Sequence, residues 1–258
     1  MLLLISPAKK LDFEEPPLDI GQTAPALMEN AATIAGIMKT QSEADLKRLM
    51  KLSDNLAKLN VDRYQTWTTE ISEQRAKQAI LAFRGDVYAG MAATAFEQGD
   101  FDFAQDHLRI LSGLYGVLRP LDMIQPHRLE MGTKLENPKG KDLYAFWKAE
   151  SAPLINRAAQ AAGGPIINLA SNEYFSSVDT AQLEYPIVTP VFKDQKNGVY
   201  KIISIYAKKA RGMMCDFFIR NRLERPDQLK DFSAAGYRFV ASESNDQTLM
   251  FMRDEADR

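Results

Sequence analysis

The sequence predicts a mixed α/β (α+β) fold in a single domain over residues 1–258. Three observations support this prediction. An apolar run of strand length lies at the start, apolar residues recur at helical spacing in several long segments, and a strand-turn-strand pattern surrounds Asn197-Gly198. No internal repeat, low-complexity tract or Gly/Ser/Pro-rich linker divides the chain. We therefore expect one core, formed by a mixed sheet with antiparallel hairpins and surrounding helices.

The first elements follow from short local patterns. Leu2 to Ile5 is apolar and is followed by Ser6-Pro7, which favours a buried strand because the run is too short for a buried helix. Residues 25–67 show helical spacing and predict two or three helices. Within them, Ser42 and Asp45 have the spacing of a capping box.

The middle of the chain alternates helical patterns with glycine breaks. A helix is predicted from Ser72 into the apolar segment AILAF, after which Arg84-Gly85-Asp86 predicts a loop. A second helix is predicted over 102–111, and it meets Gly113 and Gly116. The two prolines that follow, in RPLDMIQP, favour a loop.

The last third predicts a helix, an apolar run and two hairpins. The Asn-Gly pair is the strongest short hairpin pattern, and a helix follows its second strand directly. The predicted segments are, in order, a helix over 142–162, an apolar run over 165–170, strands over 186–193 and 199–206, a helix over 207–222, and strands over 237–241 and 248–252.

Composition limits the classes of function. The chain has 32 basic and 34 acidic residues, a formal net charge of −2, so it has no overall attraction for polyanions and any nucleic-acid site must be local. The single cysteine, Cys215, cannot form an internal disulfide, which is typical of a reducing compartment. Neither a signal peptide nor a membrane-spanning segment is evident. We expect a cytoplasmic protein with no membrane partner.

The strongest local charge lies in residues 201–225, where seven basic residues oppose two acidic ones. Lys208, Lys209 and Arg211 fall in the first turn of the predicted helix, where the helix dipole disfavours cations. A bound phosphate would compensate, since helix N-termini bind anions. Alternatively, these side chains pair with acidic segments or extend into water.

Gly113 and Gly116 lie in LSGLYGVLRPLD, between a predicted helix and a new apolar run. Such a turn would present backbone amides to a nucleic-acid phosphate, in the manner of a helix-hairpin-helix element. The alternative is an ordinary helix terminator.

Polar residues at the ends of apolar runs form a third group. Such positions line the ligand crevice of α/β folds. They include Ser6, Lys9, Arg84, Asp86, Asn168, Ser171 and Glu173, and with them Arg119, Asp122, Arg128 and Glu130. Cations beside carboxylates suit a binding protein, an enzyme or a structural ion-pair network.

Metal and cofactor patterns are weak, and we expect neither. His107, with Asp102 and Asp106, offers hard ligands without a second nearby His or a Cys pair. Lone Cys215 has no resolving partner. The sequence contains no Walker A pattern and no Gly-x-Gly-x-x-Gly after a strand.

The sequence resembles the YaaA family of bacterial peroxide stress response proteins. The resemblance covers nearly the whole chain, in the order LISPAK, AFRGDVYAG, FAQDHLRILSGLYGVLRPLD, QPHRLEMG, GKDLYAFW, INLASNEYF and KIISIYAKKARGMM. It implies a fold peculiar to the family, a positively charged cleft, a helix-hairpin-helix-like element and affinity for duplex or branched DNA. It also implies a role in limiting oxidative damage, linked to DNA repair and to control of free iron.

Three hypotheses follow. The first is a DNA-binding protein without sequence specificity that acts under peroxide stress. In this hypothesis Lys208, Lys209 and Arg211 contact phosphates, the hairpin from Gly113 to Gly116 offers amides, and the DNA-binding cleft is lined by Lys9, Arg84, Arg119 and Arg128. The second is an enzyme acting on a nucleotide, base or DNA lesion, with Asp86, Asp122, Glu130 or Glu173 as acid or base. The third is an iron-sequestering protein that uses His107.

Overall fold

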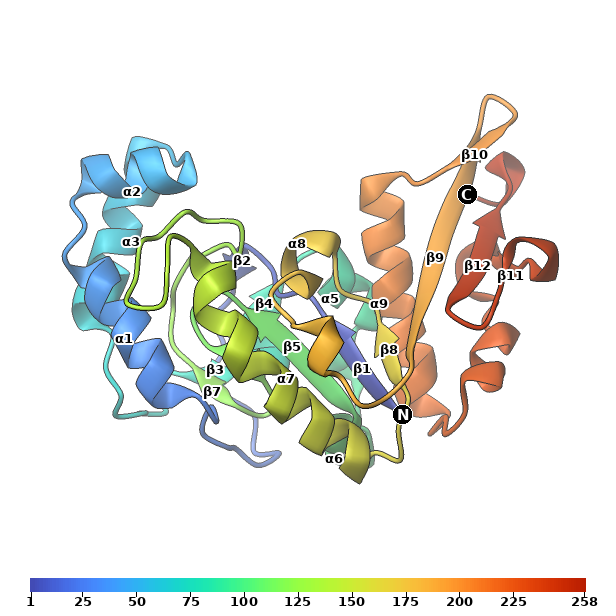
Figure 1. Ribbon diagram of the computed structural model, residues 1–258, viewed down its shortest axis with the longest axis horizontal. Helices are drawn as coiled ribbons and strands as arrows, with labels where there is room; N and C mark the ends of the chain where they lie inside the picture. The colour runs from blue at the N-terminus through green and yellow to red at the C-terminus, as the bar shows by residue number, and fades with distance from the viewer.

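The computed structural model describes residues 1–258, and its core is a mixed eight-stranded sheet covered by helices (Figure 1). The strand order is β11-β12-β9-β8-β1-β5-β6, and β10 pairs with β9. The bounds are β1 Leu2–Ile5, β5 Leu108–Ser112, β6 Gly116–Leu118, β8 Ile166–Asn168, β9 Ile187–Lys196, β10 Val199–Lys201, β11 Arg238–Phe239 and β12 Thr248–Arg253. Strands β12, β9, β8, β1 and β5 are parallel, whereas β6, β10 and β11 are antiparallel to their neighbours. The predicted mixed α/β fold with antiparallel hairpins is therefore confirmed.

Nine α-helices surround the sheet, and two small sheets flank it. The helices are α1 Met28–Lys39, α2 Glu43–Met50, α3 Asp54–Thr66, α4 Ala79–Ala82, α5 Asp86–Met91, α6 Gln98–His107, α7 Leu143–Ala161, α8 Asn172–Phe175 and α9 Ser204–Arg220. The small antiparallel sheets pair β2 (Lys10–Leu11) with β4 (Phe83–Arg84), and β3 (Lys77–Gln78) with β7 (Met123–Ile124). Figure 1 shows α1, α2 and α3 at one end of the molecule and β9 to β12 at the other. No helix is both long and apolar enough to span a membrane.

Strand β1 is the centre of the core. Every residue from Leu2 to Ile5 is fully buried, because β1 lies between β8 and β5 with a covered face on each side. This is why its sequence is continuously apolar rather than alternating. A single cluster of 65 buried apolar residues includes β1 and extends from Met1 to Phe251.

Local signals in the sequence predicted several elements correctly. The Ser42 hydroxyl accepts a hydrogen bond from the Asp45 backbone N–H, and the Asp45 carboxylate accepts one from the Ser42 N–H, which confirms the capping box of α2. Asn197 and Gly198 have positive φ values of 54° and 77° and join β9 to β10. Strands β11 and β12 form the second predicted hairpin.

Two predicted helices are wrong. The segment after Ser72 forms no long helix, because residues 77–84 divide into β3, α4 and β4. The strands that pair with β3 and β4 lie far away in the sequence. The second error concerns the helix predicted to reach Leu111. Helix α6 ends at His107, and the next residues form β5.

The helix-hairpin-helix expectation is therefore also wrong, because Gly113 lies in the connection of the β5–β6 hairpin and Gly116 is the first residue of β6. Both glycines are buried, so their amides are not presented to a ligand. Packing explains the two glycines. A Cβ on Gly116 would lie 2.7 Å from the Trp147 ring, and one on Gly113 would lie 2.4 Å from the Leu129 carbonyl oxygen.

Candidate functional site

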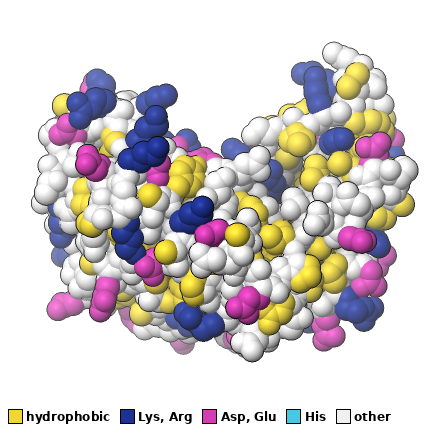
Figure 2. Space-filling view, in the orientation of Figure 1, with side chains coloured by type: hydrophobic (Ala, Val, Ile, Leu, Met, Phe, Trp, Pro, Cys, Tyr) yellow, Lys and Arg dark blue, Asp and Glu magenta, His cyan; other side chains and the backbone are white.

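A cleft of about 310 Å³ lies where β1 and β8 end. In α/β sheets, ligands bind at the carboxyl ends of the parallel strands. The face of the molecule shown in Figure 2 is hollowed between the α2 side and the β9–β10 hairpin, with Lys and Arg side chains on both rims, and the elements that line the cleft lie between these two in Figure 1. The lining residues are Ser6 to Lys10, Arg84 to Tyr88, Ser171, Glu173, Tyr174, Lys208 and Arg211.

Hydrogen bonds fix the floor of the cleft. The Ser6 hydroxyl follows β1, donates to Ser171 Oγ over 3.2 Å and accepts from the Ser171 backbone N–H over 2.9 Å. The Tyr88 hydroxyl donates to the Ser6 carbonyl oxygen over 3.2 Å, and burial raises the pKa of Tyr88, which keeps that donor protonated. These bonds join β1, the start of α8 and α5 into one rigid surface.

Two glycines bring α5 and α9 together behind this floor. A Cβ on Gly212 would lie 1.8 Å from the Val87 carbonyl oxygen, and one on Gly90 would lie 2.2 Å from the Lys209 carbonyl oxygen. The backbones of the two helices are therefore in direct contact. This contact places the first turn of α5, which begins at Asp86, beside Lys208 and Arg211 of α9.

The cations of the cleft fall into two groups, of which the first is paired with carboxylates. Lys9 Nζ lies 2.5 Å from a Glu130 carboxylate oxygen, and Arg84 Nε lies 3.0 Å from an Asp12 carboxylate oxygen. Arg128 also pairs with Glu130, over 3.1 Å, in a small recess that shares Lys9 with the cleft. The Arg128 Nε is buried and has no hydrogen-bond partner.

The second group of cations has no acidic partner. Lys10, Lys208 and Arg211 line the cleft and form neither an ion pair nor a side-chain hydrogen bond. Burial lowers the pKa of Arg211, since its guanidinium is partly removed from water with no carboxylate to compensate. Lys10 stands opposite Arg84 in the β2–β4 pair, so like charges are adjacent there. These three cations are available to an anion.

Two carboxylates share the cleft. Glu173 accepts a hydrogen bond from the Gly132 backbone N–H over 3.0 Å. Asp86 is the first residue of α5, and its carboxylate has no hydrogen-bond or ion-pair partner. The structure thus brings together carboxylates and cations predicted from distant parts of the chain.

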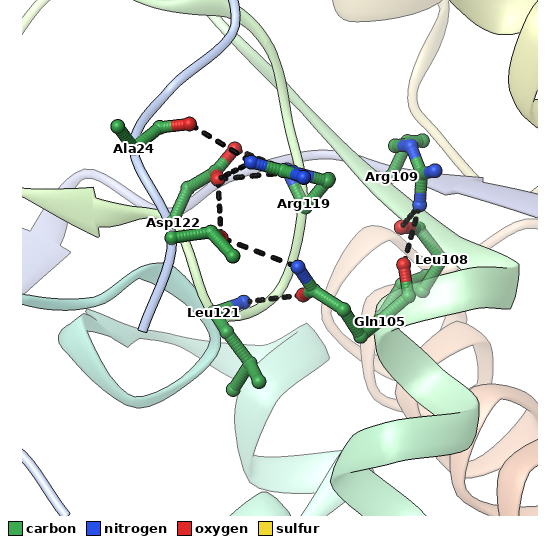
Figure 3. Close-up of polar contacts among 8 residues, drawn as sticks. Ala24, Gln105, Leu108, Arg109, Arg119, Leu121 and Asp122 are labelled. Atoms are coloured by element: carbon green, nitrogen blue, oxygen red, sulfur yellow. Dashed lines mark hydrogen bonds and ion pairs between the residues drawn. The ribbon is translucent and has the colours of Figure 1, made fainter. Parts of the chain in front are cut away.

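Arg119 and Asp122, in contrast, do not line the cleft. Figure 3 shows their contacts with each other and with Ala24. Asp122 is fully buried, accepts from Thr23 Oγ1 over 2.6 Å and pairs with Arg119 over 3.0 Å. Burial raises the pKa of Asp122 despite these bonds. The pair ties the segment before α1 to the loop after β6.

Lys209 also lies outside the cleft, although its side chain is exposed. The sequence predicted that Lys208, Lys209 and Arg211 lie in the first turn of a helix that begins at Ala207. Helix α9 begins at Ser204 instead, so these cations lie beyond its first turn and this prediction is wrong. The helix dipole therefore gives these three cations no reason to attract a phosphate. What unites Lys208 and Arg211 is their spacing of three residues, which places both on one helix face.

Sequence reasoning missed Lys10 and Tyr88. Lys10 is the first residue of β2 and directly follows Lys9, and this adjacency was the available signal. For Tyr88, the signal was its position two residues after Asp86, in the segment that follows the apolar run AILAF.

Other candidate regions contain fewer of the predicted groups. His107 stacks on Phe103 with ring centroids 4.1 Å apart, and its Nδ1 lies 2.9 Å from the Met1 carbonyl oxygen. No group of three His, Cys, Asp or Glu side chains is placed to hold a metal. A larger depression of about 660 Å³, near Tyr185 and Lys230, contains none of the predicted site residues.

Fold and site together define an α/β protein with a ligand-sized, largely cationic cleft at the carboxyl ends of its central strands. The family model described as peroxide stress protein YaaA matches residues 1–243 of the chain. Because the match covers nearly the whole sequence, the chain belongs to this family. Membership supports a role in the response to peroxide stress.

Proposed function

We propose that the protein binds DNA, duplex or branched, through phosphate contacts in this cleft, and that it does so during peroxide stress. The observation that carries the proposal is the set of three cations without acidic partners, Lys10 of β2 and Lys208 and Arg211 of α9, which reach one cleft from two distant parts of the chain. A chain with a net charge of −2 has enough carboxylates to pair them. Leaving them unpaired at the mouth of a cleft favours an external anion.

Phosphate recognition accounts for binding without sequence specificity. Contacts to the sugar-phosphate backbone fix the position of a protein on DNA but carry no base information. A cleft of about 310 Å³ can receive phosphate groups, whereas a duplex would have to lie across its rims. The cations on both rims in Figure 2 support that placement.

A salt titration tests the proposal. Each lost phosphate contact should lower the slope of log K against log salt concentration by about 0.9. We expect this decrease for Lys208→Ala and for Arg211→Ala, and no decrease for Lys209→Ala, which removes the neighbouring cation outside the cleft. Equal slopes for all four proteins would contradict the assignment, as would negligible binding by the unaltered protein.

DNA binding would explain how the protein takes part in the response to peroxide stress. A protein bound along DNA would act where peroxide damage has to be limited or repaired. The link to free iron is a separate part of the proposal, and titration of the protein and of His107→Ala with Fe(II) tests it. Stoichiometric binding that the substitution abolishes would support the link, and no binding would remove it.

A second candidate function is an enzyme acting on a nucleotide, nucleobase or DNA lesion. The observation in its favour is the pair of carboxylates, Asp86 and Glu173, that share the cleft with cations. The volume of the cleft is also within the ~300–1,000 Å³ typical of small-molecule sites. Altered bases or strand breaks in the DNA recovered from the salt titration, abolished by Asp86→Asn or Glu173→Gln, would favour this function.

A further inference from the structure

A second cationic pocket, of about 290 Å³, lies between the edge of the main sheet and α7. It shares no lining residue with the cleft. Three of its eight lining residues are arginines, namely Arg109 of β5, Arg119 after β6 and Arg157 of α7. No acidic residue lines it.

The structure holds Arg119 in a fixed position. Its Nε donates to Asp122 over 3.1 Å, and its Nη2 donates to the Ala24 carbonyl oxygen over 2.9 Å (Figure 3). Asp122 neutralises part of its charge from behind the pocket. Arg119 is therefore a preorganised group that needs little further ordering when a ligand binds.

Arg109 has no carboxylate partner. Its Nη1 donates to the carbonyl oxygens of Gln105 and Leu108, over 2.8 and 2.7 Å, at the carboxyl end of α6 (Figure 3). Capping the helix end in this way uses a single nitrogen. The Nε and Nη2 atoms of Arg109 make no hydrogen bond within the protein. Neither atom is fully buried, so both remain accessible to a ligand.

Electrostatics in the pocket favour an added anion. The pKa of Arg109 is lowered to about 10, first by burial and then by the charge of Arg119, while Asp122 and Asp106 oppose this decrease. Arg157 is exposed and forms no ion pair, so it adds a third charge that nothing in the protein compensates. Guanidinium groups bind phosphate through paired, charge-assisted hydrogen bonds.

We propose that this pocket binds the phosphoryl group of a small phosphate compound, with Arg109, Arg119 and Arg157 as its ligands. The rest of the wall is apolar and includes Val117, Leu154 and Ala158. Such a wall can hold the organic part of a phosphate monoester, and inorganic phosphates would use the arginines alone.

Calorimetric titrations with inorganic pyrophosphate and with adenosine monophosphate test the proposal and distinguish these two sources. We expect binding that Arg157→Ala weakens by about ten-fold or more, the effect of losing one charge-assisted contact. Tighter binding of the nucleotide would assign the apolar wall to an organic group, and tighter binding of pyrophosphate would assign the pocket to inorganic phosphates.

Two further variants separate the pocket from general charge effects. Ala161→Glu changes an exposed lining residue of α7 and places a carboxylate among the arginines, so it should weaken binding at least as much as Arg157→Ala. Lys148→Ala removes an exposed cation of the same helix outside the pocket and should leave binding unchanged. Absence of binding to the unaltered protein, or equal binding by all variants, would overturn the proposal.

The test is also independent of the proposed DNA function. Lys208→Ala should retain the component of pyrophosphate binding that Arg157→Ala weakens, and Arg157→Ala should leave the salt slope for DNA unchanged. A lower DNA slope for Arg157→Ala would assign the pocket to the path of the DNA backbone, which would overturn the proposal of a small-molecule site.

Discussion

The contact between α5 and α9 gives the sharpest test of the structure. In Gly212→Ala, the new Cβ would lie 1.8 Å from the Val87 carbonyl oxygen and 2.8 Å from the Met91 nitrogen, both of which are backbone atoms of α5. An ordinary contact begins near 3.4 Å, so the helices must separate by about 1.6 Å at this point. Flexible side chains cannot absorb that shift.

The expected cost follows from this separation. Overpacking a core costs roughly 1–3 kcal/mol, and a clash between two backbones belongs at the upper end. The higher helix propensity of alanine returns up to about 1 kcal/mol. We expect a net loss of about 2 kcal/mol in the free energy of unfolding, or a decrease in Tm of roughly 4–8 °C for a protein of this size.

Urea denaturation followed by circular dichroism measures this loss. Gly36→Ala is the matched control, because Gly36 is exposed within α1 and its added Cβ would have no atom within 4 Å. That substitution should stabilise the protein by about 0.5–1 kcal/mol. If Gly212→Ala were as stable as Gly36→Ala, the backbones of α5 and α9 would not be in contact as described.

Three further predictions concern buried polar groups. Arg253→Met should cost about 3–5 kcal/mol in denaturation experiments, because the fully buried Asp194 would lose its partner at 2.6 Å; a loss below 1 kcal/mol would mean that water reaches this carboxylate. Burial lowers the pKa of His127 to about 4, so the unfolded chain binds a proton below about pH 6.5 that the folded protein excludes. Stability should therefore fall by roughly 3 kcal/mol between pH 6.5 and 4, and His127→Gln should remove that part of the pH dependence. Burial raises the pKa of the Cys215 thiol, so an aromatic disulfide reagent should label it only after denaturation, and fast labelling of the folded protein would contradict its burial.

The sequence predicted those elements whose signals are local. The apolar run of β1, the Asn197-Gly198 turn and the Ser42 cap each specify their structure within a few residues. The helix predicted over residues 77–84 is wrong because β3 and β4 form only by pairing with distant segments. The helix-hairpin-helix prediction at Gly113 and Gly116 is wrong for a related reason. These two glycines are required by close contacts with Leu129 and Trp147, which lie elsewhere in the sequence.

The members of the candidate site were predictable in part, but the pairing of their charges was not. Polar residues after β1 and β8 were candidates for a ligand crevice, although the sequence left open whether they converge, and in the structure Ser6, Ser171 and Glu173 line one cleft. Which cations are neutralised could not be predicted, because Glu130 and Asp12 reach Lys9 and Arg84 only in the folded chain.

What marks the two proposed anion sites is that unpaired cations line one cavity, Lys10, Lys208 and Arg211 in the cleft and Arg109 and Arg157 in the second pocket. The basic segment over residues 201–225 illustrates the difference between paired and unpaired cations. Arg220 and Arg222 both lie close to Asp100, at 3.8 and 2.8 Å, so they stabilise the fold and attract an external phosphate only weakly. Lys208 and Arg211 belong to the same helix as Arg220 but have no such carboxylate. Substitution of Arg220 should therefore reduce stability more than it reduces the salt slope of DNA binding, whereas substitution of Lys208 should do the reverse.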